Sequence, residues 1–231
     1  MSLVEVSQLN KTYQMGEVLI TALKDVSLEI ESGTFVSIVG PSGSGKSTIL
    51  NLVGALDQPT SGSIKVVNQE IGQLNSKQRA DFRGQHLGFV FQNFNLIPVL
   101  SVYENVEYPL LMVKNESGQK HKDRILSLLD AVGVLEQKDK KPSQVSGGQM
   151  QRVAVARALI TQPKLVIADE PTANLDHDTA YNIINLMSDM KKQFNTTFVF
   201  STHDPKIMEE AEIIYTLEDG EIKNKEDRRT P

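Results

Sequence analysis

The chain has 231 residues and a net charge of −5, with 39% hydrophobic and 23% charged residues. This length suits one sizeable α/β domain, and the acidic balance disfavours broad binding to the phosphates of nucleic acid. Cysteine is absent, which excludes disulfides and thiolate metal sites. The apolar runs are far shorter than the ~20 residues that cross a bilayer, and the N-terminus has no signal-peptide pattern. Any role at a membrane is therefore expected to come through a partner.

The first third of the chain predicts strands around one short helix. Broken alternation of apolar and polar residues indicates antiparallel strands at Leu3–Leu9 and Val18–Ile30. The nearly all-apolar run Phe35–Val39 is typical of a strand buried on both faces. A helical pattern starts at Gly45 and stops before the turn cluster at 57–62. Further strands are expected at Ser63–Val67 and Leu87–Phe91.

A helical pattern then interrupts the alternation of strands and helices. Between residues 93 and about 160 we expect helices at Val102–Val113, His121–Val132 and Gln149–Ile160. The α/β pattern returns afterwards, which predicts one domain over 1–231 with a helical subdomain at about 93–160 inserted in its core. The later elements are expected at Lys164–Ala168, Thr179–Phe194, Thr196–Ser201, Pro205–Ala211, Ile213–Leu217 and Glu221–Lys223.

Residues 40–47 read GPSGSGKS and lie between an apolar strand and a helix. Such a glycine-rich loop turns backbone N–H groups toward a polyphosphate, and the helix that follows directs its positive end to the same point. Lys46 can reach the β- and γ-phosphates, and the Ser47 hydroxyl is placed for Mg²⁺. The residues expected to hold the nucleotide here are Gly40, Pro41, Ser42, Gly43, Ser44, Gly45, Lys46, Ser47 and Thr48.

A second motif is the apolar run 165–168 that ends in two acids, Asp169 and Glu170. A strand of this kind delivers its carboxylates to the carboxyl edge of a parallel sheet, where the phosphate loop also opens. Asp169 suits the shell of a Mg²⁺ ion, and Glu170 suits the polarisation of an attacking water.

A third motif, Ser146-Gly147-Gly148-Gln149, opens another helix. Small residues at a helix start form an anion site from N–H groups and the helix dipole. The chain thus has two phosphate-binding helix starts. One γ-phosphate cannot easily use both helix starts of the same subunit. This suggests that one of the two acts in trans, on a phosphate held by another subunit.

With these motifs in this order, the sequence resembles the ABC ATPase family over nearly its whole length. The three motifs match Walker A, Walker B and the signature, in which Val145 replaces the usual leucine. Gln92 matches the Q-loop, Asn174-Leu175-Asp176 the D-loop, His203 the switch histidine and Tyr13 the aromatic that stacks on adenine. The resemblance implies a P-loop NTPase fold of ABC type, with a mixed-sheet core, an antiparallel β subdomain and an inserted helical subdomain.

The resemblance also implies a mechanism. Two copies are expected to meet head to tail, with each ATP between the phosphate loop of one copy and Ser146, Gly147, Gly148 and Gln149 of the other. Glu170 is then the expected base, His203 holds the γ-phosphate, and Gln92 senses Mg²⁺ and water. Asp176 is expected to couple the two sites. The implied cofactors are ATP and Mg²⁺, with Ser47, Gln92 and Asp169 as metal ligands.

An apolar cluster after Gln92 bears on the partner. It contains Phe94, Leu96, Ile97, Leu100 and Tyr103. In ABC transporters this region receives a coupling helix of the membrane subunit, whereas the other interpretation is core packing of the helical subdomain.

The stretches 91–98 and 168–176 are similar to the branch that includes lipoprotein-release, macrolide-export, peptide-resistance and cell-division ATPases. We therefore expect an ATPase subunit at the cytoplasmic face of the inner membrane, bound to separate permease subunits. Its role would be lipoprotein release or drug or peptide efflux, without a nucleic-acid partner. The alternative is a non-transport ABC ATPase, either of a cell-division membrane complex or associated with DNA or ribosomes.

Overall fold

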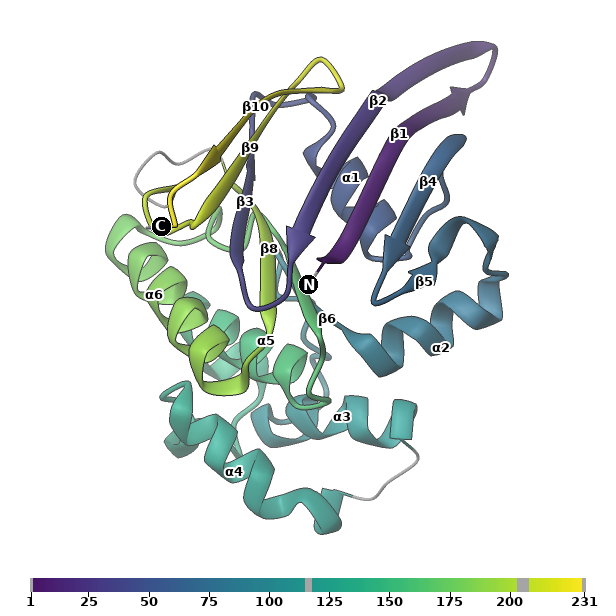
Figure 1. Cartoon of the computed structure of the whole chain (residues 1–231). Coiled ribbons are helices and arrows are strands. Elements are labelled where there is room, and N and C mark those ends of the chain that lie inside the picture. Colours follow the sequence, from purple (N-terminus) through teal and green to yellow (C-terminus); the bar gives the residue numbers. More distant parts are fainter. Residues whose placement is uncertain (1, 115–117, 203–207, 230–231) are drawn as a thin grey trace.

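The computed structural model describes residues 2–114, 118–202 and 208–229, and two β-sheets organise them (Figure 1). The smaller sheet is antiparallel, in the order β2-β1-β4-β5. The larger has the order β10-β9-β3-β8-β7-β6, and its strands run parallel except for β10. The strands are β1 (Ser2–Met15), β2 (Val18–Glu31), β3 (Phe35–Val39), β4 (Ser61–Val66), β5 (Gln69–Glu70), β6 (Leu87–Phe91), β7 (Leu165–Asp169), β8 (Thr197–Thr202), β9 (Ile213–Glu218) and β10 (Glu221–Asp227).

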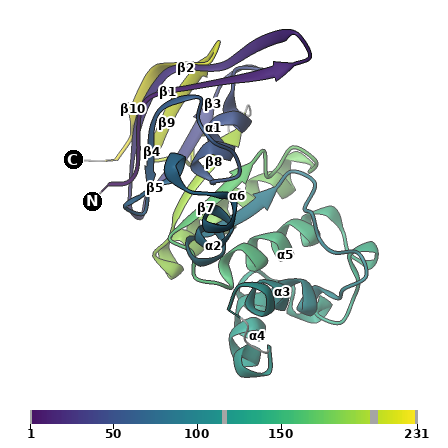
Figure 2. The same ribbon diagram turned by 90° about the vertical axis from the view of Figure 1, so that its right-hand side faces the viewer.

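The helices divide between two locations. Helix α1 packs between the two sheets, while α3, α4 and α5 come between β6 and β7 in the chain. Of these, α5 packs on β6, and α3 and α4 lie farther from the sheets (Figure 2). This arrangement matches the expected α/β fold with an antiparallel β part and an inserted helical part. The helices are α1 (Lys46–Val53), α2 (Ser76–His86), α3 (Val102–Lys114), α4 (Lys122–Ala131), α5 (Gly147–Leu159) and α6 (His177–Phe194). Short 3₁₀ turns lie at Ile71–Gln73, Gly118–His121, Leu135–Gln137 and Pro142–Gln144.

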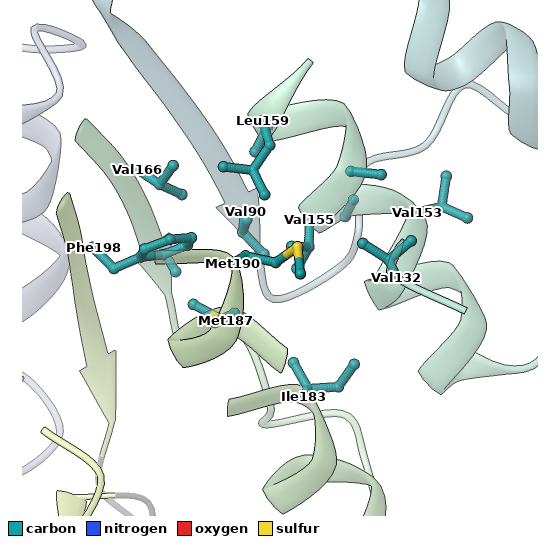
Figure 3. Packing of buried hydrophobic residues seen from close by; sticks show 14 of the residues in the cluster. Val90, Val132, Val153, Val155, Leu159, Val166, Ile183, Met187, Met190 and Phe198 are labelled. Atoms are coloured by element: carbon teal, nitrogen blue, oxygen red, sulfur yellow. The ribbon is translucent and has the colours of Figure 1, made fainter. Parts of the chain in front are cut away.

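The larger sheet separates two apolar cores. Successive side chains of a strand point to opposite faces, so Phe35 of β3 joins the core on the α5 and α6 side, whereas its neighbour Val36 joins the core around α1. In the first core, Phe198 of β8 and Val166 of β7 lie near Met187 of α6 (Figure 3). Each fully buried side chain of this size contributes roughly 1.5–3 kcal/mol. Burial on both faces explains why the central strands are nearly all apolar.

Some elements differ from those that the pattern predicts. Helix α2 was not expected, because its sequence is polar and buries only Phe82. Its local signal is a capping box, in which Asn75 and Gln78 each bond the other's backbone N–H. Strand β1 continues past Leu9 to Met15, because it stays paired with β2 up to their hairpin turn. Part of the helix expected at Pro205–Ala211 lies outside the described residues.

Candidate nucleotide-binding site

Four neighbouring strands end at one edge of the larger sheet. Val39, the last residue of β3, pairs with Thr202 at the end of β8, and Phe91 of β6 pairs with Asp169 of β7. Because these strands are parallel, the loop after β3, the acids at the end of β7 and Gln92 after β6 open on the same side. The structure therefore brings together three motifs that are far apart in the sequence.

The phosphate loop is packed closely against its support. A Cβ atom on Gly40 would lie 2.0 Å from the carbonyl oxygen of Leu217 in β9, so only glycine fits there. The backbone N–H of Gly220, in the β9–β10 turn, donates to the Ser44 carbonyl at 3.1 Å. Gly45 has a φ of 104° and precedes the first residue of α1. These contacts come from backbone atoms and fix the loop at the positive end of α1.

Lys46 is buried with its ammonium group directed back at the loop. Its Nζ donates to the carbonyls of Gly40 at 2.9 Å and Pro41 at 3.0 Å. The two nearby carbonyls thus give the buried ammonium group hydrogen-bond acceptors and hold it beside the phosphate loop. The lysine is therefore placed where a phosphate oxygen can replace a carbonyl as its acceptor.

Tyr13 lies beside the first turn of α1. Its hydroxyl donates to Oδ2 of Asp57 at 3.0 Å, and Nζ of Lys11 is 4.7 Å from the centroid of its ring. Burial raises the pKa of Tyr13, a hydrogen bond with Thr48 opposes this, and Asp57 raises it further. The ring is thus held from one strand of the smaller sheet against the helix that carries the phosphate loop.

The two acids after β7 are organised by Ser201. The Ser201 hydroxyl donates to Oδ1 of Asp169 at 2.6 Å and accepts the backbone N–H of Glu170 at 2.8 Å. Glu170 itself has a φ of 43°, a left-handed conformation that costs a non-glycine residue on the order of 1–3 kcal/mol. The hydrogen bond to Ser201 helps to hold this strained residue in place. The sequence analysis did not assign Ser201 a role.

The second helix start that the sequence predicts to bind an anion lines a cavity of about 400 Å³. Helix α5 begins there with a capping box, in which Oγ of Ser146 accepts the N–H of Gln149 and Oε1 of Gln149 accepts the N–H of Ser146. These two side chains therefore shape the helix start, and the predicted anion contact stays with the backbone of its glycines. The lining residues are Ser146, Gly147, Gly148, Gln149, Arg152, Asn174, Leu175, Asp176, Thr179 and Asn182.

We call residues 40–48, with Tyr13 and the acids Asp169 and Glu170, the phosphate half of the site. Residues 146–149, with 174–176, are the signature half.

A family model described as "ABC transporter" matches residues 23–173, more than half of the chain. The chain belongs to this family.

Two relatives are each more than 40% identical to this ABC protein over the residues that align. It is 44% identical to the lipoprotein-releasing system ATP-binding protein LolD of Pseudoalteromonas translucida, over 96% of both chains. It is 43% identical to the macrolide export ATP-binding/permease protein MacB of Syntrophobacter fumaroxidans, over 96% of this chain and 31% of MacB. The chain thus spans about a third of the MacB length and nearly all of LolD.

A solved structure has the same ABC fold. It is the cassette MJ0796 of Methanocaldococcus jannaschii, described as the dimeric structure of a post-hydrolysis state bound to ADP and Pi. The TM-score is 0.90 at 43% identity, and the match covers 99% of this chain and 100% of that one. The chain is therefore an ABC-type ATPase. Within the described residues, no helix combines the length and apolar character needed to span a bilayer.

The D-loop of this ABC protein is tied to the other loops. Nδ2 of Asn174 donates to the carbonyl of Gln92 at 3.0 Å and to Oδ1 of Asn93 at 2.9 Å. Asp176 caps α6 by accepting the N–H of Thr179 at 3.0 Å, and the Thr179 hydrogen bonds lower the pKa of that carboxyl. The expected coupling role of Asp176 stays a prediction. His203 lies outside the described residues.

The expected Mg²⁺ ligands can be compared with the donor atoms present. The described residues contain no group of three or more His, Cys, Asp or Glu side chains that could hold a metal. A Mg²⁺ ion does not require such a group, because it keeps several waters and binds one or two protein oxygens together with the substrate phosphates. Ser47 is exposed in the first turn of α1, and Asp169 is held by Ser201 at the same sheet edge. These oxygens suit such a site better than one built only from protein ligands.

Proposed function

We propose that two copies of this chain bind two ATP molecules head to tail and use their hydrolysis to drive separate membrane subunits. The observation that supports this is that one chain has two helix starts with glycine-rich sequences, after Gly45 and after Ser146, in different surroundings. A head-to-tail pair lets each ATP contact the phosphate half of one copy and the signature half of the other. The dimeric MJ0796 cassette supports this arrangement.

The chemistry follows from the phosphate half. Backbone N–H groups and Lys46 hold the polyphosphate, and Glu170 takes a proton from the attacking water. Asp169 and Ser47 would hold Mg²⁺, which offsets the charge of the phosphates when bound. Gln92 and His203 are proposed to orient the γ-phosphate and water. The strained backbone of Glu170 and its bond to Ser201 favour a fixed position for the base.

A cleft between α2 and α3 is proposed as the site for a short helix of the membrane subunit. It has a volume of about 380 Å³ and a mainly apolar lining that includes Phe89, Pro109 and Val113. Met112 on the adjoining face of α3 is 63% exposed. The cleft also reaches Asn95, three residues after Gln92. A helix bound there would lie close to the residue proposed to sense the nucleotide.

The cargo class is proposed from the relatives. LolD is named for lipoprotein release and MacB for macrolide export. We propose a subunit that associates with permease subunits at the cytoplasmic face of the inner membrane. Lipoprotein release and drug or peptide efflux are the two candidate activities.

The enzymatic part is tested by Glu170→Gln, which keeps the shape of the side chain and removes its basicity. We expect ATP to bind with little change, hydrolysis to fall by about 10²- to 10⁴-fold, and an ATP-dependent dimer to accumulate. ATPase assays and analytical ultracentrifugation measure these effects. Lys46→Ala is the control that loses nucleotide binding itself. Unchanged turnover in Glu170→Gln would contradict the role of Glu170.

The partner is tested by affinity purification of the tagged Glu170→Gln protein from detergent-solubilised native cells in the presence of ATP. Co-elution of a stoichiometric integral membrane protein supports the proposal, and its extramembrane domain distinguishes lipoprotein release from efflux or cell division. Recovery of only soluble proteins, DNA or ribosomes would contradict the membrane role and leave the ATPase chemistry in place.

A further inference from the structure

The turn that follows Gln92 has an unusual backbone. Phe94 and Asn95 both have left-handed conformations, with φ angles of 60° and 48°. Within the turn, the N–H of Phe94 donates to the carbonyl of Phe91 at 3.1 Å. Two successive non-glycine residues in this conformation persist only when their surroundings hold them. The question is which side chains supply that support.

Two side chains from distant segments bind this turn on its carbonyl groups. The guanidinium of Arg157, in α5, donates from one nitrogen to the carbonyl of Phe94 at 2.7 Å and from another to the carbonyl of Asn95. The Asn174 amide bonds the carbonyl of Gln92 and the side chain of Asn93. Each of residues 92–95 is therefore held by a donor from α5 or from the D-loop.

The same turn touches the signature half. A Cβ atom on Gly147 would lie 3.8 Å from Cζ of Phe94 and 3.5 Å from Cδ2 of Leu175. The Phe94 ring therefore lies next to the backbone of the first residue of α5. A change in the turn would move this ring and alter the helix start that is proposed to contact the second copy's nucleotide.

We propose that Arg157 is a positioning residue whose guanidinium, together with Asn174, holds the turn 92–95 so that Phe94 supports the signature half. A lysine is expected to replace it poorly, because the planar fork binds the Phe94 and Asn95 carbonyls from two separate nitrogens, whereas an ammonium group offers one. Asn95 and Arg157 also line the cleft between α2 and α3, so a helix bound there would contact this support directly. This inference rests on the proposed function, and it assigns the route by which the cleft affects the dimer.

The test uses the full-length chain with Glu170→Gln as the parent, and ATP as the probe. Adding Arg157→Lys is expected to weaken ATP-dependent dimerisation by about tenfold or more. The affinity of the monomer for ATP should stay within about twofold, because the phosphate half is untouched. Arg124→Lys is the matched control, since Arg124 also donates to a helix carbonyl, that of Leu159, outside both halves. It should leave dimerisation unchanged.

A second variant keeps the test valid if Arg157→Lys folds poorly. Asn174 is exposed, so Asn174→Ala should fold, and it should also weaken dimerisation. Because both side chains hold one turn, the double variant should lose less than the sum of the two single losses on a free-energy scale. Dimerisation like that of the parent in both single variants would overturn the inference. Failure of the parent itself to bind ATP or to dimerise would instead overturn the proposed function.

Discussion

The phosphate half and the signature half are built by different means. The phosphate half is a strand, a loop and a helix that are continuous in the chain, and the backbone of the β9 segment packs directly beneath it. The signature half combines a helix start with the D-loop, and the turn after Gln92 is joined to it by side chains, Arg157 from α5 and Asn174 from the D-loop. Backbone packing permits little change, whereas side-chain hydrogen bonds can be exchanged at modest cost.

This contrast suits the proposed division of work. An ATP molecule needs the same rigid cradle in every cycle, so a loop supported by backbone contacts is appropriate for the phosphate half. The signature half must approach and leave the second copy, and membrane subunits must influence it. An adjustable junction of loops is appropriate there. The variants below test whether the two halves respond as differently as their construction indicates.

The largest effect is expected from Gly40→Ala. Its new Cβ atom would lie 2.0 Å from the Leu217 carbonyl oxygen, so the loop or β9 must move. We expect the free energy of unfolding to fall by about 3 kcal/mol or more and ATP binding to be lost. Urea denaturation and nucleotide titration measure both quantities.

Gly43→Ala is the matched control in the same loop. No atom lies within 4 Å of its Cβ position, and the remaining cost is that of its φ of 80°. This should lower the free energy of unfolding by only about 1–2 kcal/mol. Equal destabilisation by the two variants would show that the phosphate loop does not depend on its contact with β9.

A smaller and more selective effect is expected from Gly147→Ala in the signature half. Its Cβ atom would lie no closer than 3.5 Å to Leu175, which is ordinary contact, so the free energy of unfolding should change by less than about 0.5 kcal/mol. The added methyl group would, however, stand on the face proposed to meet the second copy's phosphates. We expect normal ATP binding by the monomer and weakened ATP-dependent dimerisation.

Gly148→Ala provides the comparison for this prediction. Its Cβ atom would lie 2.6 Å from Cγ2 of Thr179, so that side chain must move. It should therefore lose stability as well as dimerisation. Normal dimerisation by Gly147→Ala would contradict the placement of this glycine at the interface.

The difference between the halves also explains what sequence reasoning could and could not find. The phosphate loop and the two acids after β7 were predicted because each is a short continuous motif whose neighbours in the chain determine its surroundings. The parallel strands then bring them to one edge, which the α/β pattern also predicts. These parts, and the α/β pattern with its helical interruption, follow from local pattern, whereas the ABC type of the fold was implied by the family resemblance.

The junction around the signature half has no comparable local signal. Arg157 lies 62 residues from Asn95 in the sequence, and Asn174 lies 82 residues from Gln92, so their hydrogen bonds depend on the tertiary fold. Ser201 was likewise missed, because its link to Asp169 joins two separate strands. The resemblance marked Gln149 as a ligand residue, and only the structure shows that its side chain caps α5.

The smallest effect is expected far from both halves, at His86. This residue ends α2 directly before β6 begins, whereas Gln92 follows the opposite end of that strand. Burial lowers the pKa of His86, and the charge of Lys164 lowers it further. The unfolded chain, with a histidine pKa of about 6.5, therefore binds more protons than the folded chain as the pH falls below neutrality. Protonation thus favours the unfolded state, and this part of the stability is lost as the pH decreases through 6.5.

His86→Gln removes the titrating group. The free energy of unfolding should change less between about pH 7.5 and 5.5 in this variant than in the unmodified chain. The two changes should differ by less than about 0.5 kcal/mol, because solvent screens the partly exposed ring. Urea denaturation at the two pH values measures it, and Lys164→Gln should give an intermediate difference. ATP affinity should change with pH equally in this variant and in the unmodified chain, because His86 lies at the opposite edge of the sheet from the proposed nucleotide site. If the pH dependence of unfolding were the same in both, other groups would account for it.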